Sequence, residues 1–464
     1  MKTKEKPKPY LLAQYCKGCG RCIEACAHHC IELSNEIHPQ TGLIPVTIDL
    51  EACTACGLCF EACPEPFALL PIADEPLPEI QDVEDVLEVA PPPPKPEPQP
   101  DEVIPLPELA PMVLKGTYAA AIGAILAGCR NFFGYPITPS TEGAELMAAI
   151  LPKINGTFVQ AVSEVATVNH MYGTGGAGKR VMTFTSSPGF SLMLEGISYM
   201  IGAEVPGVFI NIMRGGPGLG NIAPEQGDIK LACHGLGHGN TYAIVLAPNS
   251  PQEMLDLTMM AFDLAFKYRN PVIVLGDGYL GQITGKVKLP SYMIKPGLPE
   301  WAVFGDREHR RNLINSIYLE EGDLEHHNFY LSEKYQKMAE NEQRADCYFC
   351  EDAEYLLVAS NTPSRMVKGA VRALREEGIR AGLFRPITLW PFPIKHLEPL
   401  LPKAKHIVVV EASDGQLEDE LRLALSRAEI HEFPPIDHIR HMGGILPQQE
   451  EVFEKVIQLE GVLS

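Results

Sequence analysis

The sequence has no long apolar run and no excess of positive charge, and we expect no leader peptide. Its longest apolar runs, such as residues 118–127, are too short to cross a bilayer. No apolar stretch follows the lysines of the first eight residues, so we expect a cytoplasmic chain without a membrane partner. The formal net charge of -21 argues against nucleic acid as a partner, and a site for an anionic substrate must therefore supply its own cation.

Cysteine is scarce outside one short region. Nine of the thirteen cysteines fall within residues 16–63, and in a long chain without a secretion signal this clustering favours metal over disulfides. The region contains the pattern C-x2-C-x2-C-x3-C twice, at an offset of 37 residues. In two-cluster ferredoxins, each such loop supplies three thiolates to one cluster and the fourth thiolate to the other cluster.

This crossed pattern predicts two [4Fe–4S] clusters in a ferredoxin-like domain. A pair of structural zinc sites is the alternative, but zinc does not require eight cysteines at this doubled spacing. Pro64 follows Cys63 as the pattern demands, whereas Ala27 follows Cys26. Cys30 is either a small buried side chain or a replacement for Cys26. The predicted ligands are Cys16, Cys19, Cys22 and Cys63 for one cluster, and Cys53, Cys56, Cys59 and Cys26 for the other.

Beyond the cysteines, the chain divides into segments of different composition. A Pro- and Glu-rich stretch that includes "APPPPKPEPQP" cannot build a core and is typical of a semi-rigid linker. Apolar strands then alternate with helical runs, which indicates βαβ units and a parallel sheet. We therefore expect an α/β chain with five parts: a ferredoxin-like domain (1–73), a linker (74–111), a large α/β domain (112–285), an irregular segment (286–350) and a smaller α/β domain (351–464).

Four further motifs attract attention without predicting a site. "GTGGAGKR" at residues 173–180 resembles phosphate-binding loops, but a helix precedes it and a strand follows, the reverse of what such loops need. "GDG" at 276–278 resembles the start of a thiamine diphosphate metal motif, but the asparagine pair expected some 25 residues later is absent. The Cys and His residues of "ACHGLGHGN" are weak evidence for a metal, and Cys347 and Cys350 are most simply two reduced thiols.

Five stretches in order carry a family resemblance: "GYPITPSTE", "TSSPGFSLMLEGISYMIGAE", "RGGPGLGN", "KYRNPVIVLGDG" and "RPITLWPFP". Together they resemble the alpha subunit of 2-oxoacid:ferredoxin oxidoreductases, closest to the 2-oxoisovalerate and 2-oxoglutarate types. The resemblance covers residue 113 to the C-terminus. The N-terminal part resembles the small two-cluster subunit of the same enzymes.

The resemblance implies oxidative decarboxylation of a 2-oxoacid to an acyl-coenzyme A, with electrons leaving through the clusters to ferredoxin. It implies a thiamine diphosphate pyrimidine-binding-type domain, a transketolase C-terminal-like domain, a beta subunit that holds the diphosphate and Mg²⁺, and a gamma subunit. Thr138 and Arg214 match the residues that bind substrate, and Glu164 matches the glutamate that bonds the aminopyrimidine ring. Pro136, in the same turn as Thr138, is placed beside the cofactor.

Three of these residues also have a plain structural explanation. Thr138 could cap the following helix, Arg214 could form a surface ion pair, and Glu164 could favour a helix N-terminus through the dipole. The whole chain has an alternative as well, since it could be a non-catalytic electron-transfer adaptor. The joint presence of Thr138, Glu164 and Arg214 argues against the adaptor.

Overall fold

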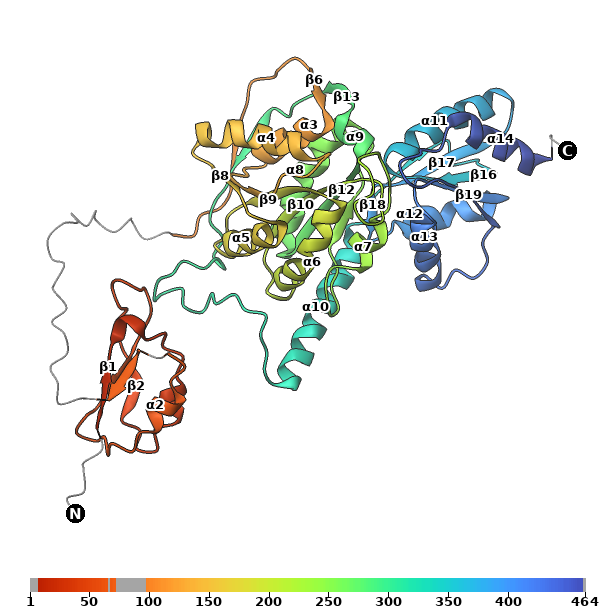
Figure 1. The fold of residues 1–464 in the computed structure, drawn as a ribbon. Helices are drawn as coiled ribbons and strands as arrows, with labels where there is room; N and C mark the ends of the chain where they lie inside the picture. The colour runs from red at the N-terminus through yellow and green to blue at the C-terminus, as the bar shows by residue number, and fades with distance from the viewer. Residues whose placement is uncertain (1–6, 66, 72–96, 462–464) are drawn as a thin grey trace. The chain divides into compact units, whose positions relative to one another are not determined.

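The computed structural model describes residues 7–65, 67–71 and 97–461. They belong to two compact units, Met1–Lys95 and Pro96–Ser464, whose folds are shown in Figure 1. Much of the expected linker, residues 74–96, lies outside the described residues. None of the helices in the described ranges is long and apolar enough to span a membrane.

The first unit is built from two short antiparallel strand pairs around the cysteines. Strand β1 (Pro9–Leu11) pairs with β4 (Leu69–Pro71), and β2 (Ile31–Leu33) pairs with β3 (Val46–Ile48). A 3-10 turn η1 (Ala13–Tyr15) and two short helices, α1 (Arg21–Glu24) and α2 (Leu58–Ala62), lie between the strands. Its small core contains more cysteine than aliphatic side chains, which shows how much this domain depends on its cysteines.

The cysteine repeat is also a conformational repeat. Gly20 and Gly57 each precede a short helix and have φ angles of +80° and +90°. Gly18 and Ala55, also 37 residues apart, both have positive φ. Left-handed backbone is costly for alanine, so the second loop adopts the first loop's path despite its residue type. The repeat therefore extends from spacing to loop geometry.

A seven-stranded sheet forms the centre of the second unit, in the order β18-β11-β12-β10-β9-β7-β8. Every residue of β10 and β12 is buried, as expected of parallel strands covered on both faces. Only β18 is antiparallel to its neighbour. The strands are β7 (Asn131–Gly134), β8 (Thr157–Gln160), β9 (Val181–Ser186), β10 (Gly207–Met213), β11 (Ile244–Leu246), β12 (Pro271–Asp277) and β18 (Thr388–Trp390).

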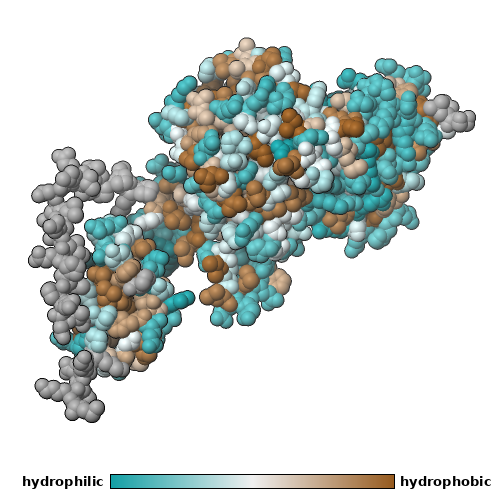
Figure 2. All heavy atoms as spheres, viewed as in Figure 1, coloured by the Kyte–Doolittle hydropathy of each residue, from teal (hydrophilic) through white to brown (hydrophobic). Residues whose placement is uncertain are grey.

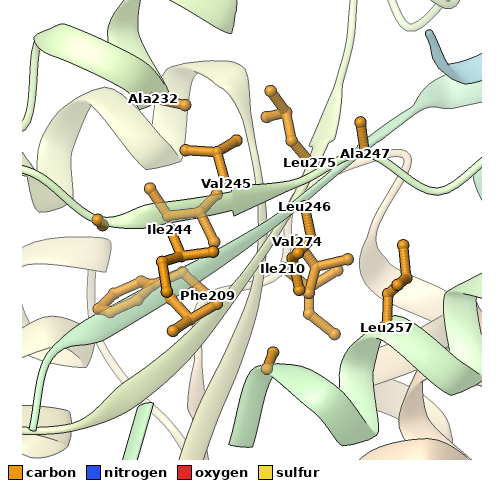
Figure 3. Packing of buried hydrophobic residues seen from close by; sticks show 14 of the residues in the cluster. Phe209, Ile210, Ala232, Ile244, Val245, Leu246, Ala247, Leu257, Val274 and Leu275 are labelled. Carbon is orange, nitrogen blue, oxygen red and sulfur yellow. The ribbon is translucent and has the colours of Figure 1, made fainter. Parts of the chain in front are cut away.

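Helices lie on both faces of this sheet (Figure 1). One layer contains α3 (Gly116–Leu126), α4 (Thr141–Ile150) and α8 (Pro251–Tyr268), and the other contains α5 (Glu164–Gly176), α6 (Ser187–Gly202) and α7 (Ile229–His234). Figure 3 shows Phe209, Val245 and Val274 of neighbouring strands packed within the core between these layers. The short elements η2 (Leu151–Ile154) and α9 (Gly278–Gln282) follow α4 and β12.

A five-stranded sheet follows, in the order β15-β17-β16-β19-β20. Its first strand is antiparallel and the other four are parallel. The strands are β15 (Ala345–Tyr348), β16 (Tyr355–Val358), β17 (Ala381–Pro386), β19 (His406–Glu411) and β20 (Ile436–Arg440). The accompanying helices are α11 (Asn361–Glu376), α12 (Ile394–Leu397), η3 (Glu398–Lys403), α13 (Gln416–Arg427) and α14 (Gln449–Glu460). The mixed α/β class predicted from the sequence is confirmed.

The two sheets share one apolar core and a buried polar junction. Leu356 and Phe384 of the smaller sheet belong to the same core cluster as the strands of the larger one. At the junction, the buried Asp277 carboxylate accepts hydrogen bonds from the backbone N–H of Leu280 (2.9 Å) and Thr362 (2.9 Å) and from the Thr362 hydroxyl (2.8 Å). The aspartate of "GDG" therefore caps α9 and ties the domains together.

Two segments expected to be irregular are ordered. Residues 97–111 were expected to be linker, but β5 (Glu102–Pro105) pairs antiparallel with β14 (Tyr292–Lys295). Pro105 is tolerated there because edge strands leave one side of the backbone unpaired. The segment 286–350, expected to be irregular, contains α10 (Glu321–Asn341), and β13 (Thr284–Val287) pairs with β6 (Met112–Lys115). Helix α10 escapes detection because its many charged residues obscure a narrow buried stripe.

We expect Asp277→Ala to lower the free energy of unfolding of the chain by about 2–4 kcal/mol, because buried donors from two domains lose their acceptor. Urea unfolding followed by circular dichroism measures the change. Glu376→Ala, at the exposed end of α11, is the matched control and should shift the value by less than about 0.5 kcal/mol. Equal stability of the two variants would contradict the role given to this carboxylate.

Candidate active site and iron–sulfur centres

The polar residues singled out in the sequence lie where strands of the seven-stranded sheet end. The turn "GYPITPST" follows β7, and Arg214 follows β10 directly. Because these strands are parallel through β9, their carboxyl ends meet at the same edge of the sheet. This edge is where open α/β sheets bind ligands.

Arg214 joins the two loops at this edge. Its Nη1 donates to the carbonyl oxygen of Thr138 at 2.8 Å, and its Nη2 donates to that of Leu219 at 3.3 Å. The Nε atom is buried and has no hydrogen-bond partner in the described part of the chain. The guanidinium therefore fixes the turn and retains unused N–H groups, which suits a carboxylate ligand.

The turn itself presents a hydroxyl to solvent. Thr138 and Pro136 are both exposed, and the Thr138–Pro139 peptide bond is cis. Ser140 holds the turn from within by donating to the Ile137 carbonyl at 2.8 Å. The structure brings Thr138 and Arg214 together as a pair, whereas Pro136 offers only an apolar ring near them.

Glu164 is the first residue of α5 and is 4% exposed. The helix is capped by the preceding residue, since the Ser163 hydroxyl accepts from the Ala166 N–H at 3.2 Å. Among the described residues, none donates a hydrogen bond to the Glu164 carboxylate or forms an ion pair with it. Its oxygens are not among the fully buried atoms that lack a partner, so the mostly buried carboxylate can still accept from a donor outside the chain, such as the aminopyrimidine of thiamine diphosphate.

The start of α6 lies between Glu164 and Arg214. A Cβ atom at Gly189 would lie 2.5 Å from Glu164 Oε1, so only glycine leaves the carboxylate its place. Two residues earlier, the Ser187 hydroxyl accepts from the Arg214 backbone N–H at 3.1 Å. Helix α6 thus connects the carboxylate and the guanidinium without a direct contact between the two side chains.

A cleft of about 430 Å³ opens beside Arg214, between α6, the glycine-rich loop after β10 and the loop that leads into α13. Arg214 is the one basic residue among the described residues that line it. Glu225 shapes the cleft by accepting from the backbone N–H of Gly216 (2.6 Å) and Gly443 (3.2 Å). Burial raises the pKa of Asp228, while hydrogen bonds from Ser187 and Asn211 oppose that shift.

Sequence reasoning missed these cleft residues. Glu225 and Asp228 follow "RGGPGLGN" closely, but nothing in their spacing shows that they are buried. Gln416 and Asp414 come from the smaller domain and reach the cleft only through the packing of the two sheets. The quoted motif "RGGPGLGN" was the available signal, because a glycine-rich loop after a parallel strand is a common place for ligand contacts.

Apolar side chains surround this edge without being covered. Val162, just before α5, is 88% exposed, and Leu219, in the loop beside Arg214, is 86% exposed. Leu192, Ile222 and Tyr135 are exposed as well. On the face shown in Figure 2, hydrophobic patches lie mainly on the domain of the larger sheet, whereas the smaller domain is mostly hydrophilic. Exposed apolar groups around a polar site are typical of an interface with another protein.

The motifs that did not predict a site have structural roles. "GTGGAGKR" ends α5 and turns into β9, with Gly178 at φ +72°. In "ACHGLGHGN", His234 contacts the buried Glu420 of α13 at 2.9 Å, which links the two domains. Cys347 lies on an edge strand, and the Cys350 thiol donates to the Leu383 carbonyl at 3.0 Å.

The cysteines of the first unit gather into two sets, one around Cys22 and one around Cys59. In the first set, burial and the neighbouring Cys16, Cys63 and Cys19 raise the pKa of Cys22 to about 11. In the second, burial and the neighbouring Cys53 and Cys56 raise the pKa of Cys59. Such thiols lose their protons readily only when a cation takes their place.

The second set lines a small cavity that also receives Cys26 and Cys30. No group of three or more Cys, His, Asp or Glu side chains in the described ranges is drawn close enough to hold a single metal ion. A cubane is larger than an ion and takes one thiolate at each of four irons, so its ligands stand further apart. The two sets therefore fit clusters, and these would carry single electrons.

Comparison with known proteins agrees with this organisation. Residues 122–345 match the thiamine diphosphate-binding domain of pyruvate flavodoxin/ferredoxin oxidoreductases, residues 353–452 match core domain II of pyruvate:ferredoxin oxidoreductase, and residues 15–66 match a 4Fe–4S dicluster domain.

The curated relatives cover most of the chain. The ketoisovalerate oxidoreductase subunit VorB of Methanothermobacter thermautotrophicus is 46% identical over 355 residues, which are 76% of this chain and 99% of the relative. The 2-oxoglutarate synthase subunit KorA of Methanocaldococcus jannaschii is 39% identical over 369 residues, 74% of this chain and 98% of the relative.

A solved structure gives the same result. The 2-oxoglutarate:ferredoxin oxidoreductase of Magnetococcus marinus, with 2-oxoglutarate, coenzyme A and succinyl-CoA bound, superposes with a TM-score of 0.66 at 27% identity, over 75% of this chain and 65% of that one. The chain belongs to the family of 2-oxoacid:ferredoxin oxidoreductase subunits, with a 4Fe–4S dicluster domain at the N-terminal side of its thiamine diphosphate-binding domain.

Proposed function

We propose that the chain is the alpha-type subunit of an enzyme that converts 2-oxoisovalerate or a similar branched 2-oxoacid, with coenzyme A, into the acyl-coenzyme A and carbon dioxide. Two electrons leave through the clusters to ferredoxin, and one proton is released. The observation that carries the proposal is the contact of Arg214 with the Thr138 turn, at the sheet edge where the buried Glu164 has no hydrogen-bond donor among the described residues.

Each residue has a separate task in this proposal. Arg214 binds the substrate carboxylate with its remaining N–H groups, and the Thr138 hydroxyl donates to the same substrate. Glu164 accepts from the aminopyrimidine ring and so sets the protonation state of its nitrogens. Thiamine diphosphate, when bound, supplies the electron sink that the decarboxylation needs.

The branched substrate is favoured over 2-oxoglutarate by the charges of the cleft. A dicarboxylate needs a second cation, but the other ionisable residues that line the cleft in the described ranges are Glu225, Asp228 and Asp414. Leu219 is exposed and its carbonyl accepts from the Arg214 guanidinium, so its side chain suits an aliphatic group of the substrate. The higher identity to the ketoisovalerate relative, 46% against 39%, points the same way.

Partner subunits complete the site. The aspartate of "GDG", Asp277, already accepts hydrogen bonds at the junction between the two sheets. The diphosphate and its Mg²⁺ are therefore assigned to a beta subunit. That subunit would cover the apolar groups at Val162, Leu192 and Leu219. A gamma subunit and an external ferredoxin complete the proposed assembly.

The complex isolated without oxygen should reduce viologen in a coenzyme A-dependent way, and kcat/KM should be highest for 2-oxoisovalerate in a panel with 2-oxoglutarate, pyruvate and an aryl pyruvate. If kcat/KM is highest for 2-oxoglutarate, the proposed reaction stands and the proposed substrate is wrong. If no 2-oxoacid of the panel is oxidised although thiamine diphosphate and the partner subunits are shown to be present, a non-catalytic electron-transfer adaptor is the better explanation.

Arg214→Lys should lower kcat/KM for the 2-oxoacid by about 10–100-fold, mainly through KM, because an ammonium cannot bind the turn and the substrate in the bidentate way of a guanidinium. Steady-state kinetics of the complex measures this. Arg365→Lys, an exposed arginine on α11 that donates to the Asn249 carbonyl, is the control and should leave KM unchanged. An unchanged KM for Arg214→Lys would remove this residue from the substrate site.

Glu164→Gln should lower kcat by about 100-fold or more, because an amide cannot stabilise the protonated aminopyrimidine as a carboxylate does. Titration of the cofactor-free complex with thiamine diphosphate, followed by circular dichroism, tests binding apart from turnover. Glu145→Gln, on the exposed face of α4, should behave as the wild type. Wild-type kcat and cofactor affinity in Glu164→Gln would show that its buried position is purely structural.

A further inference from the structure

The second set of cysteines has five members, one more than a cubane takes. Cys26, Cys30, Cys53, Cys56 and Cys59 all line the same small cavity. The first set, in the described residues, has the required four. The sequence pattern accounts for four thiols in each set and leaves Cys30 without a task.

Cys26 and Cys30 are presented to the cavity by two different elements. Cys26 follows α1, and a tight turn follows it, in which the His29 N–H donates to the Cys26 carbonyl at 3.1 Å with His29 at φ +51°. Cys30 stands immediately before β2, and its carbonyl accepts from the Asp49 N–H at 2.8 Å, beside β3. Both thiols are therefore fixed by backbone contacts.

The two sulfur atoms are 3.3 Å apart, and both side chains are buried. Each iron of a cubane takes one thiolate, and the four iron–thiolate bonds point away from one another. Two thiolates in contact are therefore too close to serve different irons of one cluster.

We propose that Cys26 and Cys30 are interchangeable ligands of the same iron in the second cluster. In an exchange, the incoming thiol gives its proton to the outgoing thiolate as one iron–sulfur bond forms and the other breaks. No electron is gained or lost, and no other reactant is needed. The inference concerns cluster binding alone and does not depend on the proposed substrate.

The test is the metal content of the full chain, produced without oxygen, in the variants Cys26→Ala, Cys30→Ala and the double variant. Iron and acid-labile sulfide are counted, and the reduced clusters are followed by electron paramagnetic resonance. Each single variant should retain both clusters, with a small shift in the signal of the second. The double variant should lose about half of the iron or convert the second cluster to a form that lacks one iron.

Cys22→Ala is the matched control, because it removes a buried thiol from the set that has no spare. It should damage the first cluster as a single substitution. Loss of the second cluster in either Cys26→Ala or Cys30→Ala, after reconstitution with iron and sulfide, overturns the proposal and identifies the sole ligand. If an alanine variant loses both clusters, the serine variant at that position replaces it, and the same loss there also overturns the proposal.

Discussion

Helices cover both faces of the seven-stranded sheet, and polar chemistry is therefore confined to the edge where the strands end. Strands β10 and β12 contain no exposed residue, which leaves the loops after them as the place where a guanidinium or a carboxylate can meet a ligand. Arg214 makes use of this confinement. Its hydrogen bond to the Thr138 carbonyl joins the loops after β7 and β10. The start of α6 contacts both Arg214, through Ser187, and Glu164, through Gly189.

The sequence predicts much of this fold because strands that helices cover on both faces leave a clear pattern of continuous apolar runs. Strands buried on both faces must be apolar throughout, and the runs that became β9, β10 and β12 are easily recognised. The pattern fails where burial is partial. Helix α10 buries only Leu331, Lys334, Tyr335 and Met338 over six turns, and β18 has three residues whose pairing depends on contacts distant in sequence. Residues 97–111 were predicted to be linker because of their prolines, but an edge strand such as β5 tolerates proline.

The candidate site was predictable to a similar degree, and for comparable reasons. Arg214 and Thr138 follow strand ends, so topology alone places them at one edge, and the structure shows them in contact. The fixed spacing of the cysteines reflects the shape of a cluster, which is why local sequence suffices there. Glu225, Asp228 and Gln416 depend instead on how two domains pack, and no local pattern encodes that. The contact between Cys26 and Cys30 arises from a turn and the start of a strand, which come together only in the folded domain.

Strand β18 has a consequence for how this protein is made. Strand β18 completes the sheet edge at β11, yet it follows β12 by more than a hundred residues. It is synthesised after β15, β16 and β17 of the smaller sheet. On the ribosome, the larger domain therefore emerges with an open edge and can close it only when Thr388–Trp390 have left the exit tunnel. The order of synthesis and the order of completion differ, so the two domains mature together rather than in sequence. A gene cut between them would separate a sheet from its own last strand.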